Sequence, residues 1–183
     1  MIDHDYDLLS RCLKKEVAAE DQLYHQFAPK MYGLCLRYAG NETEAEDILQ
    51  DGFMRLFNHM HQFRFEGRVE AWIRRIFVRT AINYYQQNLK FSMEVELKNA
   101  DDLPALQEDA LSALSAKELL AIIQHLTPAY RTIFNMHVIE NYAITEIADL
   151  LGISEGTARS QFHRAKNRVR QMLIQRENYH TIS

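Results

Sequence analysis

The segment from Ser154 to Arg168 carries side chains of the kinds that read duplex DNA. Arginine can donate two hydrogen bonds to guanine, glutamate can accept from cytosine, and hydroxyl groups can pair with several base edges. On a helix that enters the major groove, the first exposed residues face base edges and the later cations face phosphates. We therefore predict duplex contacts from ten residues: Ser154, Glu155, Thr157, Arg159, Ser160, Gln161, His163, Arg164, Lys166 and Arg168.

The residues around this segment have the pattern of a helix-turn-helix. Residues 143–151 predict a short helix, Gly152 predicts the turn, and Ser154 is a suitable N-cap for the next helix. The inward positions of that second helix recur at spacings of four and three: Ala158, Phe162, Ala165, Val169 and Met172 or Leu173. The alternative is an ordinary helical hairpin in which the basic helix is simply solvated.

A further helix precedes this motif and completes a unit over about residues 127–176. Thr127-Pro128 predicts an N-cap followed by a proline in the first helical position. That helix should end near Glu140, where Asn141 can adopt the left-handed conformation. Upstream, an apolar helical face is formed by Leu119, Ile122, Ile123 and Leu126.

The net charge of −4 conceals two basic blocks. Residues 61–90 carry six bases against two acids, and residues 155–176 carry six bases against one, whereas residues 41–60 and 91–112 are acidic. Two basic blocks on one chain indicate two contacts with polyanions. A charge this close to neutral predicts weak binding to DNA in isolation, because phosphate neutralisation supplies most non-specific affinity. A partner must therefore help to hold the protein on DNA.

In the first basic block, one aromatic residue and two arginines recur at spacings of three and four along a predicted helix, and two further aromatic residues precede that helix. Single-stranded nucleic acid is bound by cations along its backbone and by flat surfaces or pockets for unstacked bases. We predict such contacts from Phe63, Arg64, Phe65, Trp72, Arg75, Arg79 and Asn83. The alternative for the aromatic residues, and for Trp72 above all, is ordinary packing in the core.

Helical periodicity and the small number of glycines and prolines predict an all-α fold. We expect two small helical domains, a bundle at residues 1–90 and a helix-turn-helix domain at 113–178. The acidic segment 91–112 has no sustained helical period and contains Pro104, so we predict a flexible linker.

In the first domain we expect one helix over residues 19–39, kinked at Pro29. The next helix should start at a capping box formed by Thr43 and Glu46. It should bury Ala45, Ile48, Leu49, Phe53, Leu56, Phe57 and Met60. A third helix over residues 68–87 should bury Ile73, Ile76, Phe77, Thr80 and Ala81.

Other function classes are disfavoured by what the sequence lacks. Its apolar stretches are too short to span a bilayer, and the acidic N-terminus has no signal-peptide core, so we expect a cytoplasmic protein without membrane insertion. Cys12 and Cys35 lack metal or redox spacing and are expected to be reduced thiols. There is no hydrolase, P-loop or dinucleotide motif, and His59 and His61 lack convincing metal partners. We therefore expect no enzymatic activity, no cofactor and no metal.

Segments of both predicted domains resemble the sigma-70 family of RNA polymerase sigma factors, and more particularly its small extracytoplasmic-function (ECF) members. Residues 44–53, EAEDILQDGF, and 65–76, FEGRVEAWIRRI, look like region 2 of that family. Residues 126–128, LTP, and 142–166, YAITEIADLLGISEGTARSQFHRAK, look like region 4. The resemblance covers about residues 15–90 and 112–176, in the family's order.

This resemblance implies a role for each surface. The helix that begins near Thr43 would dock on the clamp helices of the largest polymerase subunit through Asp47, Gln50, Asp51 and Met54. The basic-aromatic residues would bind the melted minus-ten element, and the recognition helix would read the minus-thirty-five duplex. Core RNA polymerase, including its flap, promoter DNA and an anti-sigma factor are the implied partners.

The alternative is a stand-alone helix-turn-helix regulator that binds duplex DNA without polymerase. The chain also departs from the family pattern in three places. Ala143 replaces the usual capping hydroxyl, Tyr84-Tyr85-Gln86-Gln87 stands where relatives carry an arginine pair, and Ala158 and Gln161 replace more usual residues of the recognition helix. The promoter preference of relatives therefore cannot be assumed.

Overall fold

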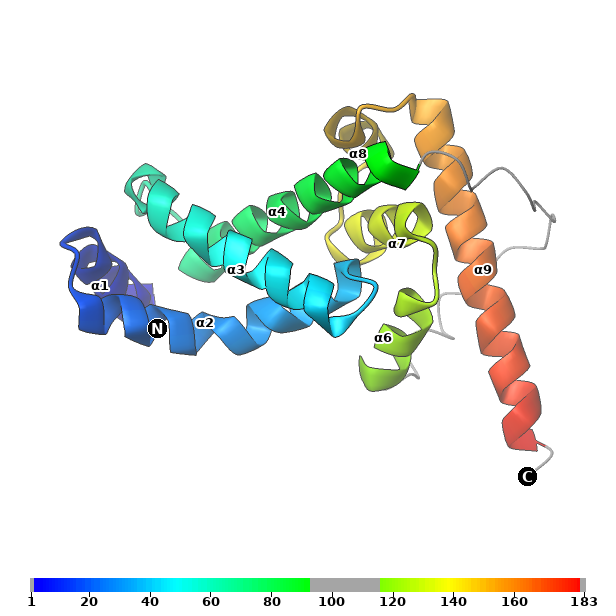
Figure 1. Cartoon of the computed structure of the whole chain (residues 1–183), viewed down its shortest axis with the longest axis horizontal. Coiled ribbons are helices and arrows are strands. Elements are labelled where there is room, and N and C mark those ends of the chain that lie inside the picture. The colour runs from blue at the N-terminus through cyan, green and yellow to red at the C-terminus, as the bar shows by residue number, and fades with distance from the viewer. Residues whose placement is uncertain (1, 93–115, 182–183) are drawn as a thin grey trace. The chain divides into compact units, whose positions relative to one another are not determined.

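The computed structural model describes residues 2–92 and 116–181, and every regular element in these two ranges is a helix. The predicted linker therefore lies outside the described residues, apart from its first two positions. The chain divides into two units, Met1–Tyr84 (unit 1) and Tyr85–Ser183 (unit 2). Figure 1 shows α1 to α4 in blue to green and α6 to α9 in yellow-green to red. The all-α prediction is confirmed.

Unit 1 begins with a helix that the sequence patterns did not predict, α1, over Ile2–Leu13. Its apolar stripe is short, but Leu8, Leu9 and Cys12 are all buried, and the helix packs on α2. The Nε2 amide of Gln26 in α2 donates a hydrogen bond of 2.8 Å to Asp5. These contacts fix α1 on the unit.

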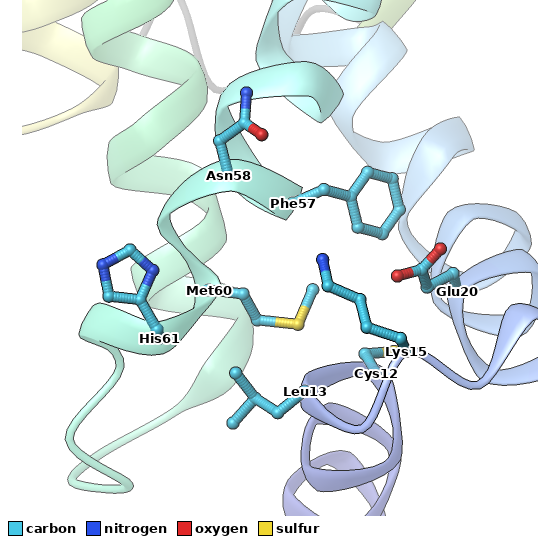
Figure 2. Close-up of a pocket in the computed structure, with 8 residues that line it drawn as sticks. All are labelled: Cys12, Leu13, Lys15, Glu20, Phe57, Asn58, Met60 and His61. Carbon is cyan, nitrogen blue, oxygen red and sulfur yellow. The ribbon is translucent and has the colours of Figure 1, made fainter.

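The seam between the α1–α2 turn and the end of α3 is not completely filled. A cavity of about 210 Å³ remains there, and Figure 2 shows the side chains that surround it. They are Cys12, Leu13, Lys15, Glu20, Phe57, Asn58, Met60 and His61. None of the predicted site residues belongs to this set.

Helix α2, Val17–Tyr38, continues through Pro29. The exposed pyrrolidine ring of Pro29 interrupts one backbone hydrogen bond without ending the helix. Inward residues repeat at spacings of four and three along α2: Ala19, Leu23, Phe27, Met31, Leu34, Cys35 and Tyr38.

The predicted start of the next helix is wrong by two residues. Helix α3, Glu42–His59, is capped by Asn41, whose side chain accepts a hydrogen bond of 2.8 Å from the backbone N–H of Glu44. Glu44 in turn accepts from the backbone N–H of Gly40 at 2.8 Å. Asn41 and not Thr43 is the N-cap, because asparagine caps at least as well as threonine. With the cap at Asn41, the Glu44 side chain can also accept from the N–H of Gly40.

Helix α4, Val69–Ser92, is five residues longer at its C-terminus than predicted. It packs against α3 where Gly52 faces the ring of Phe77: a Cβ atom on Gly52 would lie 2.3 Å from that ring. Most of the predicted core residues of α3 and α4 are buried. The exceptions are Leu49, Phe57 and Ile76, which are half-buried.

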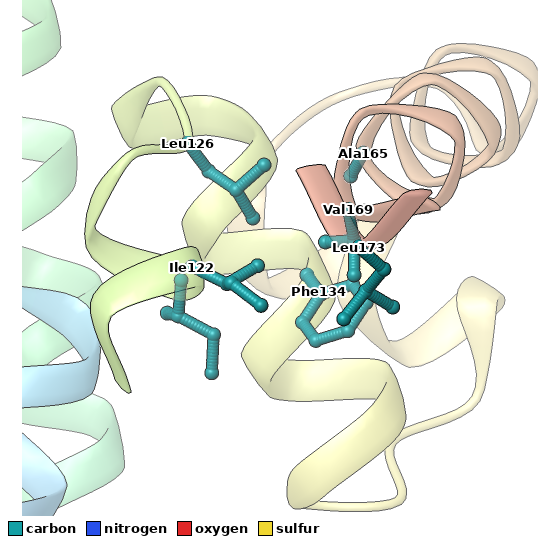
Figure 3. Packing of buried hydrophobic residues seen from close by; sticks show 7 residues of the cluster. Ile122, Leu126, Phe134, Ala165, Val169 and Leu173 are labelled. Carbon is teal, nitrogen blue, oxygen red and sulfur yellow. The ribbon is translucent and has the colours of Figure 1, made fainter. Parts of the chain in front are cut away.

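Unit 2 contains α6 (Ala116–Gln124), α7 (Pro128–Phe134), a π-helical turn η2 (Asn135–Ile139), α8 (Ile144–Leu151) and α9 (Glu155–Thr181). Both α7 and α8 pack on α9. Figure 3 shows the apolar cluster between α6, α7 and α9, which is built from Ile122, Ile123, Leu126, Phe134, Ala165, Val169 and Leu173.

A buried arginine links the first two helices of this unit. Arg131 is 6% exposed, and its Nη2 atom donates hydrogen bonds to the carbonyl oxygens of Gln124 at 3.2 Å and Leu126 at 2.9 Å. The last carbonyl groups of a helix have no partner within the helix, and here the guanidinium supplies one. Arg131 therefore fixes the turn between α6 and α7.

The backbone confirms the predicted end of the helix before the motif and the predicted turn between its two helices. Asn141 and Gly152 both adopt the left-handed conformation, with φ of 59° and 67°. Ala143 provides no side-chain cap for α8, but the Glu146 carboxylate accepts from the Ala143 N–H at 2.7 Å. Half of a capping box thus remains, although Ala143 lacks the hydroxyl that relatives carry at this position.

Candidate DNA and protein interfaces

The start of α9 presents the predicted duplex-contact residues to solvent. Of the ten, Gln161 and Lys166 are half-buried and the other eight are exposed. The inner face of the same helix is fixed in the unit, because Ala158, Ala165 and Val169 are fully buried. The orientation of the outer faces is therefore determined by core packing.

Two of these residues also form the start of the helix. The Ser154 hydroxyl accepts from the Thr157 backbone N–H at 3.0 Å, which confirms Ser154 as the N-cap. The two hydroxyl groups are themselves 2.8 Å apart and hydrogen-bonded. Their first role in the free protein is to close the first turn of α9.

The principal base-reading candidate, Arg159, forms an ion pair with Glu155 one turn earlier. Its guanidinium is therefore held over the N-terminal turn, where a helix inserted in the major groove meets base edges. Further along, the Asn167 side chain lies 3.2 Å from His163 Nε2, and Arg168 donates to Gln171 at 3.1 Å.

Helix α4 carries the predicted single-strand stripe. Arg75 and Arg79 are exposed, while Trp72 and Asn83 are half-buried at the two ends of the stripe. Among the described residues, no carboxylate forms an ion pair with Arg75 or Arg79. Their charges therefore remain available to an external polyanion.

The aromatic residues before α4 form a packed cluster. The rings of Phe63 and Trp72 have centroids 5.1 Å apart, and those of Phe63 and Phe65 are 5.3 Å apart. Phe63 is only 6% exposed, whereas Phe65 is 38% exposed. In the free protein Phe63 supports the cluster, and Phe65 is the ring that a base could reach. For Trp72 the packing alternative holds at least in part.

The predicted polymerase-docking residues lie on the outer side of α3. Asp47, Gln50 and Met54 are exposed, with Met54 at 58%. Asp51 is half-buried, and the Nε atom of Arg55 donates to its carboxylate at 2.9 Å. The negative charge of this surface is thus partly neutralised within the helix.

The structure adds an apolar groove that the sequence patterns did not reveal. Its volume is about 600 Å³, and it is lined by Tyr24 and Tyr32 of α2 together with Glu46, Leu49, Gln50, Phe53, Met54 and Phe57 of α3. Desolvation raises the pKa of Tyr32, and the carboxylates of Glu42 and Glu46 raise it further. The spacing of eight residues between the tyrosines, two helical turns, was the available signal. Lining this groove also explains why Leu49 and Phe57 are only half-buried.

The described ranges show neither a candidate metal site nor a candidate membrane span. Within residues 2–92 and 116–181, no group of histidine, cysteine, aspartate or glutamate side chains could hold a metal ion. In the same ranges, no helix combines the length and apolar character needed to cross a membrane.

Family models match a segment in each half of the chain. Residues 23–90 match Sigma-70 region 2, and residues 116–169 match Sigma-70 region 4. The chain belongs to the sigma-70 family, among its ECF sigma factors. The groove on α2 and α3 and the stripe on α4 fall within the region 2 match, and the duplex-contact residues up to Arg168 fall within the region 4 match.

Similar sequences are ECF sigma factors. The chain is 30% identical to ECF RNA polymerase sigma factor SigE of Mycolicibacterium smegmatis, over 84% of this chain and 61% of SigE. It therefore spans less than two thirds of that relative. It is 27% identical to ECF RNA polymerase sigma factor SigW of Bacillus subtilis, over 80% of this chain and 84% of SigW.

A solved structure shares the fold. The sigma factor RpoE from Bartonella quintana, crystallised with the anti-sigma factor NepR, superimposes with a TM-score of 0.51. The two sequences are 20% identical, over 85% of this chain and 96% of that chain.

Proposed function

We propose that this ECF sigma factor binds core RNA polymerase, directs it to particular promoters and promotes local melting of the promoter. The observation that supports the proposal best is that both family segments match in order, and that each one exposes a distinct surface. The protein itself would catalyse no reaction, and it would act in the cytoplasm on the polymerase and the chromosome.

Polymerase docking is assigned to the outer side of α3. Exposed Asp47, Gln50 and Met54 border the groove or lie beside it, and two tyrosines of α2 extend the apolar surface. An apolar groove rimmed by acidic residues suits a partner helix that combines apolar and basic side chains. In the family such a partner is the pair of clamp helices of the largest subunit.

DNA contacts are divided between the units. Domain 1–90 would hold the melted minus-ten strand with Arg64, Phe65, Arg75 and Arg79, and domain 113–178 would read the minus-thirty-five duplex with α9. Arg75 and Arg79 on α4 are exposed and have no ion pair within the described residues, which favours an extended polyanion. The ion pair with Glu155 holds Arg159 over the first turn of α9, which supports a contact with base edges. The segment between the domains, 91–112, would follow the polymerase surface. An anti-sigma factor would regulate access to both units.

Transcription with purified core polymerase tests the proposal. The wild-type protein should direct run-off transcription from a promoter of its host, and the double variant Asp47→Ala/Asp51→Ala should reduce it. Gln50→Ala/Met54→Ala should reduce it as well, because these residues line the groove. Asp21→Ala is the matched control, since it removes an exposed carboxylate from α2 outside the groove. If the wild-type protein initiates at no host promoter, the proposed function is wrong.

Promoter reading is tested by two arginine variants of α9. Arg159→Ala should cost about 1–3 kcal/mol of discrimination at one base pair of the minus-thirty-five element, because base contacts specify. Arg168→Ala should weaken binding of the holoenzyme uniformly across sequences, because a phosphate contact carries no sequence information. Tight promoter binding by the protein without polymerase would favour the stand-alone regulator instead.

A further inference from the structure

Helix α1 precedes the segment that matches Sigma-70 region 2, which begins at residue 23. No surface assigned so far includes it. One side chain of α1, Tyr6, nevertheless contacts the loop Phe63–Gly67, which lies next to the predicted single-strand stripe.

Tyr6 holds this loop by two kinds of contact. Its hydroxyl donates a hydrogen bond of 2.7 Å to the carbonyl oxygen of Gly67. Its ring packs edge-on against Phe63, with centroids 5.8 Å apart, and against Phe65 at 5.7 Å. Polar and aromatic contacts from one side chain thus reach both ends of the loop.

The loop needs such support because its backbone is strained. Phe65 has a φ of 55° and Gly67 a φ of 75°. Glycine adopts the left-handed region freely, but a bulky residue does so only when its surroundings enforce it. In Phe65 this conformation accompanies a ring that is partly exposed, beside the buried ring of Phe63.

The position of Tyr6 is itself fixed. Leu8, Leu9 and Cys12 anchor α1 in the core of unit 1, and Gln26 of α2 donates to Asp5, the residue before Tyr6. The helix contacts η1, Met60–Gln62, which leads directly into the loop. Tyr6 can therefore transmit the rigidity of the core to the Phe63–Gly67 backbone.

We infer that Tyr6 is a positioning residue that holds the Phe63–Gly67 loop in the conformation that selects a base of the melted minus-ten strand. This inference rests on the proposed function for its DNA part, whereas the loop contact can be tested on the protein alone. Tyr6 does not itself touch the base. It acts indirectly, by fixing the positions of the Phe65 ring and the Gly67 backbone.

The first test measures the loop directly. Trp72 is the single tryptophan of the chain and packs on Phe63, so its fluorescence reports the cluster. In Tyr6→Ala, Trp72 should become more accessible to acrylamide, and trypsin should cleave at Arg64 faster. Tyr6→Phe, which keeps the ring and loses only the hydrogen bond, should give a smaller change. His4→Ala, an exposed change on the same helix, is the control.

The second test measures base preference with the holoenzyme. Initiation is compared on templates that carry each of the four bases at each minus-ten position. Tyr6→Phe should reduce the ratio between the best and worst base by about five-fold, the effect of one hydrogen bond, and Tyr6→Ala should reduce it further. Simple loss of folded protein would lower the rate on every template equally and leave this ratio unchanged.

The outcomes separate the two proposals. Unchanged Trp72 quenching in Tyr6→Ala overturns the loop contact, whatever the polymerase assay gives. A loosened loop with an unchanged base ratio overturns the role of Tyr6 in base selection. A wild-type protein that never initiates refutes the proposed function and with it the base-selection role, while the fluorescence result still decides the contact.

Discussion

The two units build their candidate DNA surfaces from different numbers of elements. In unit 2 the predicted duplex-contact residues lie along the first half of α9, from the N-cap Ser154 to Arg168. In unit 1 the single-strand residues come from α4 and from the Phe63–Gly67 loop, and the loop is held by Tyr6 of α1. One surface follows from a helical repeat, whereas the other exists only when several elements pack.

This difference has a consequence for robustness. A surface on one helix is changed mainly by the residues of that helix, because their directions are set by the helical geometry. A surface assembled from several elements is also changed by core residues that never meet the ligand. The candidate DNA surface of unit 1 should therefore be sensitive to buried substitutions far from it, and that of unit 2 should respond chiefly to local ones.

The largest effect is expected for Gly52→Ala. The new Cβ would overlap the Phe77 ring at 2.3 Å, so α3 and α4 must separate or Phe77 must move. Overpacking of this kind costs about 1–3 kcal/mol. We expect unit 1 to unfold at lower urea concentration, as measured by Trp72 fluorescence, and both core-polymerase and minus-ten binding to fall.

Gly33→Ala is the matched control for Gly52→Ala. Nothing lies within 4 Å of the Cβ position on Gly33, which is inside α2. Replacing a helical glycine by alanine should stabilise unit 1 by about 0.5–1 kcal/mol. Equal effects of the two variants would contradict the close α3–α4 packing.

Alkaline pH should distinguish the two units. Both cysteines lie in unit 1, and burial raises the pKa of Cys35 from 9.0 to about 12. The folded state keeps this thiol protonated where the unfolded chain ionises, so its contribution to stability is complete below pH 9 and is lost as the pH rises towards 12. The loss should not exceed about 1.4 kcal/mol per pH unit.

Urea unfolding of the wild type and of Cys35→Ala at pH 8 and pH 10 measures this contribution. The stability difference between the two proteins should be smaller at pH 10, because only the wild type loses the thiol contribution. A difference that grows with pH would show that the thiol is not the group responsible.

Loss of the N-cap should have a local effect in unit 2. Ser154→Ala removes the acceptor of the Thr157 N–H and should cost about 1 kcal/mol of unit 2 stability, seen by circular dichroism. Ser160→Ala, an exposed change within the same helix, should have little effect on stability. Trp72 fluorescence should report no change in unit 1 for either variant.

The smallest effects concern the start of α3, where the cap differs from the prediction. Asn41→Ala should lower the free energy of unfolding of unit 1 by about 1 kcal/mol or slightly less, because Asn41 accepts from the Glu44 N–H. Thr43→Ala should stay within about 0.5 kcal/mol, since Thr43 is exposed and is not the cap. If urea unfolding shows a larger loss of stability for Thr43→Ala than for Asn41→Ala, Thr43 and not Asn41 is the N-cap.

Local signals in the sequence determined the buried faces of most helices and the positions of two turns. The alternation of apolar residues defined the inner faces of α2, α3, α4 and α9, and short-range chemistry placed the turns at Asn141 and Gly152. These features depend on residues within one or two helical turns, so a single sequence is sufficient to predict them. The two family segments, in the family's order, indicated a sigma factor.

Only the tertiary structure decided the rest. The apolar stripe of α1 is too short to be recognised in the sequence. The helix is stabilised by burial of Leu8 and Leu9 against the rest of the unit. The apolar groove joins α2 to α3, and the contact between Tyr6 and Gly67 spans 61 residues of sequence. Such contacts arise when elements meet in space, and nothing in the local spacing of residues specifies which faces will meet.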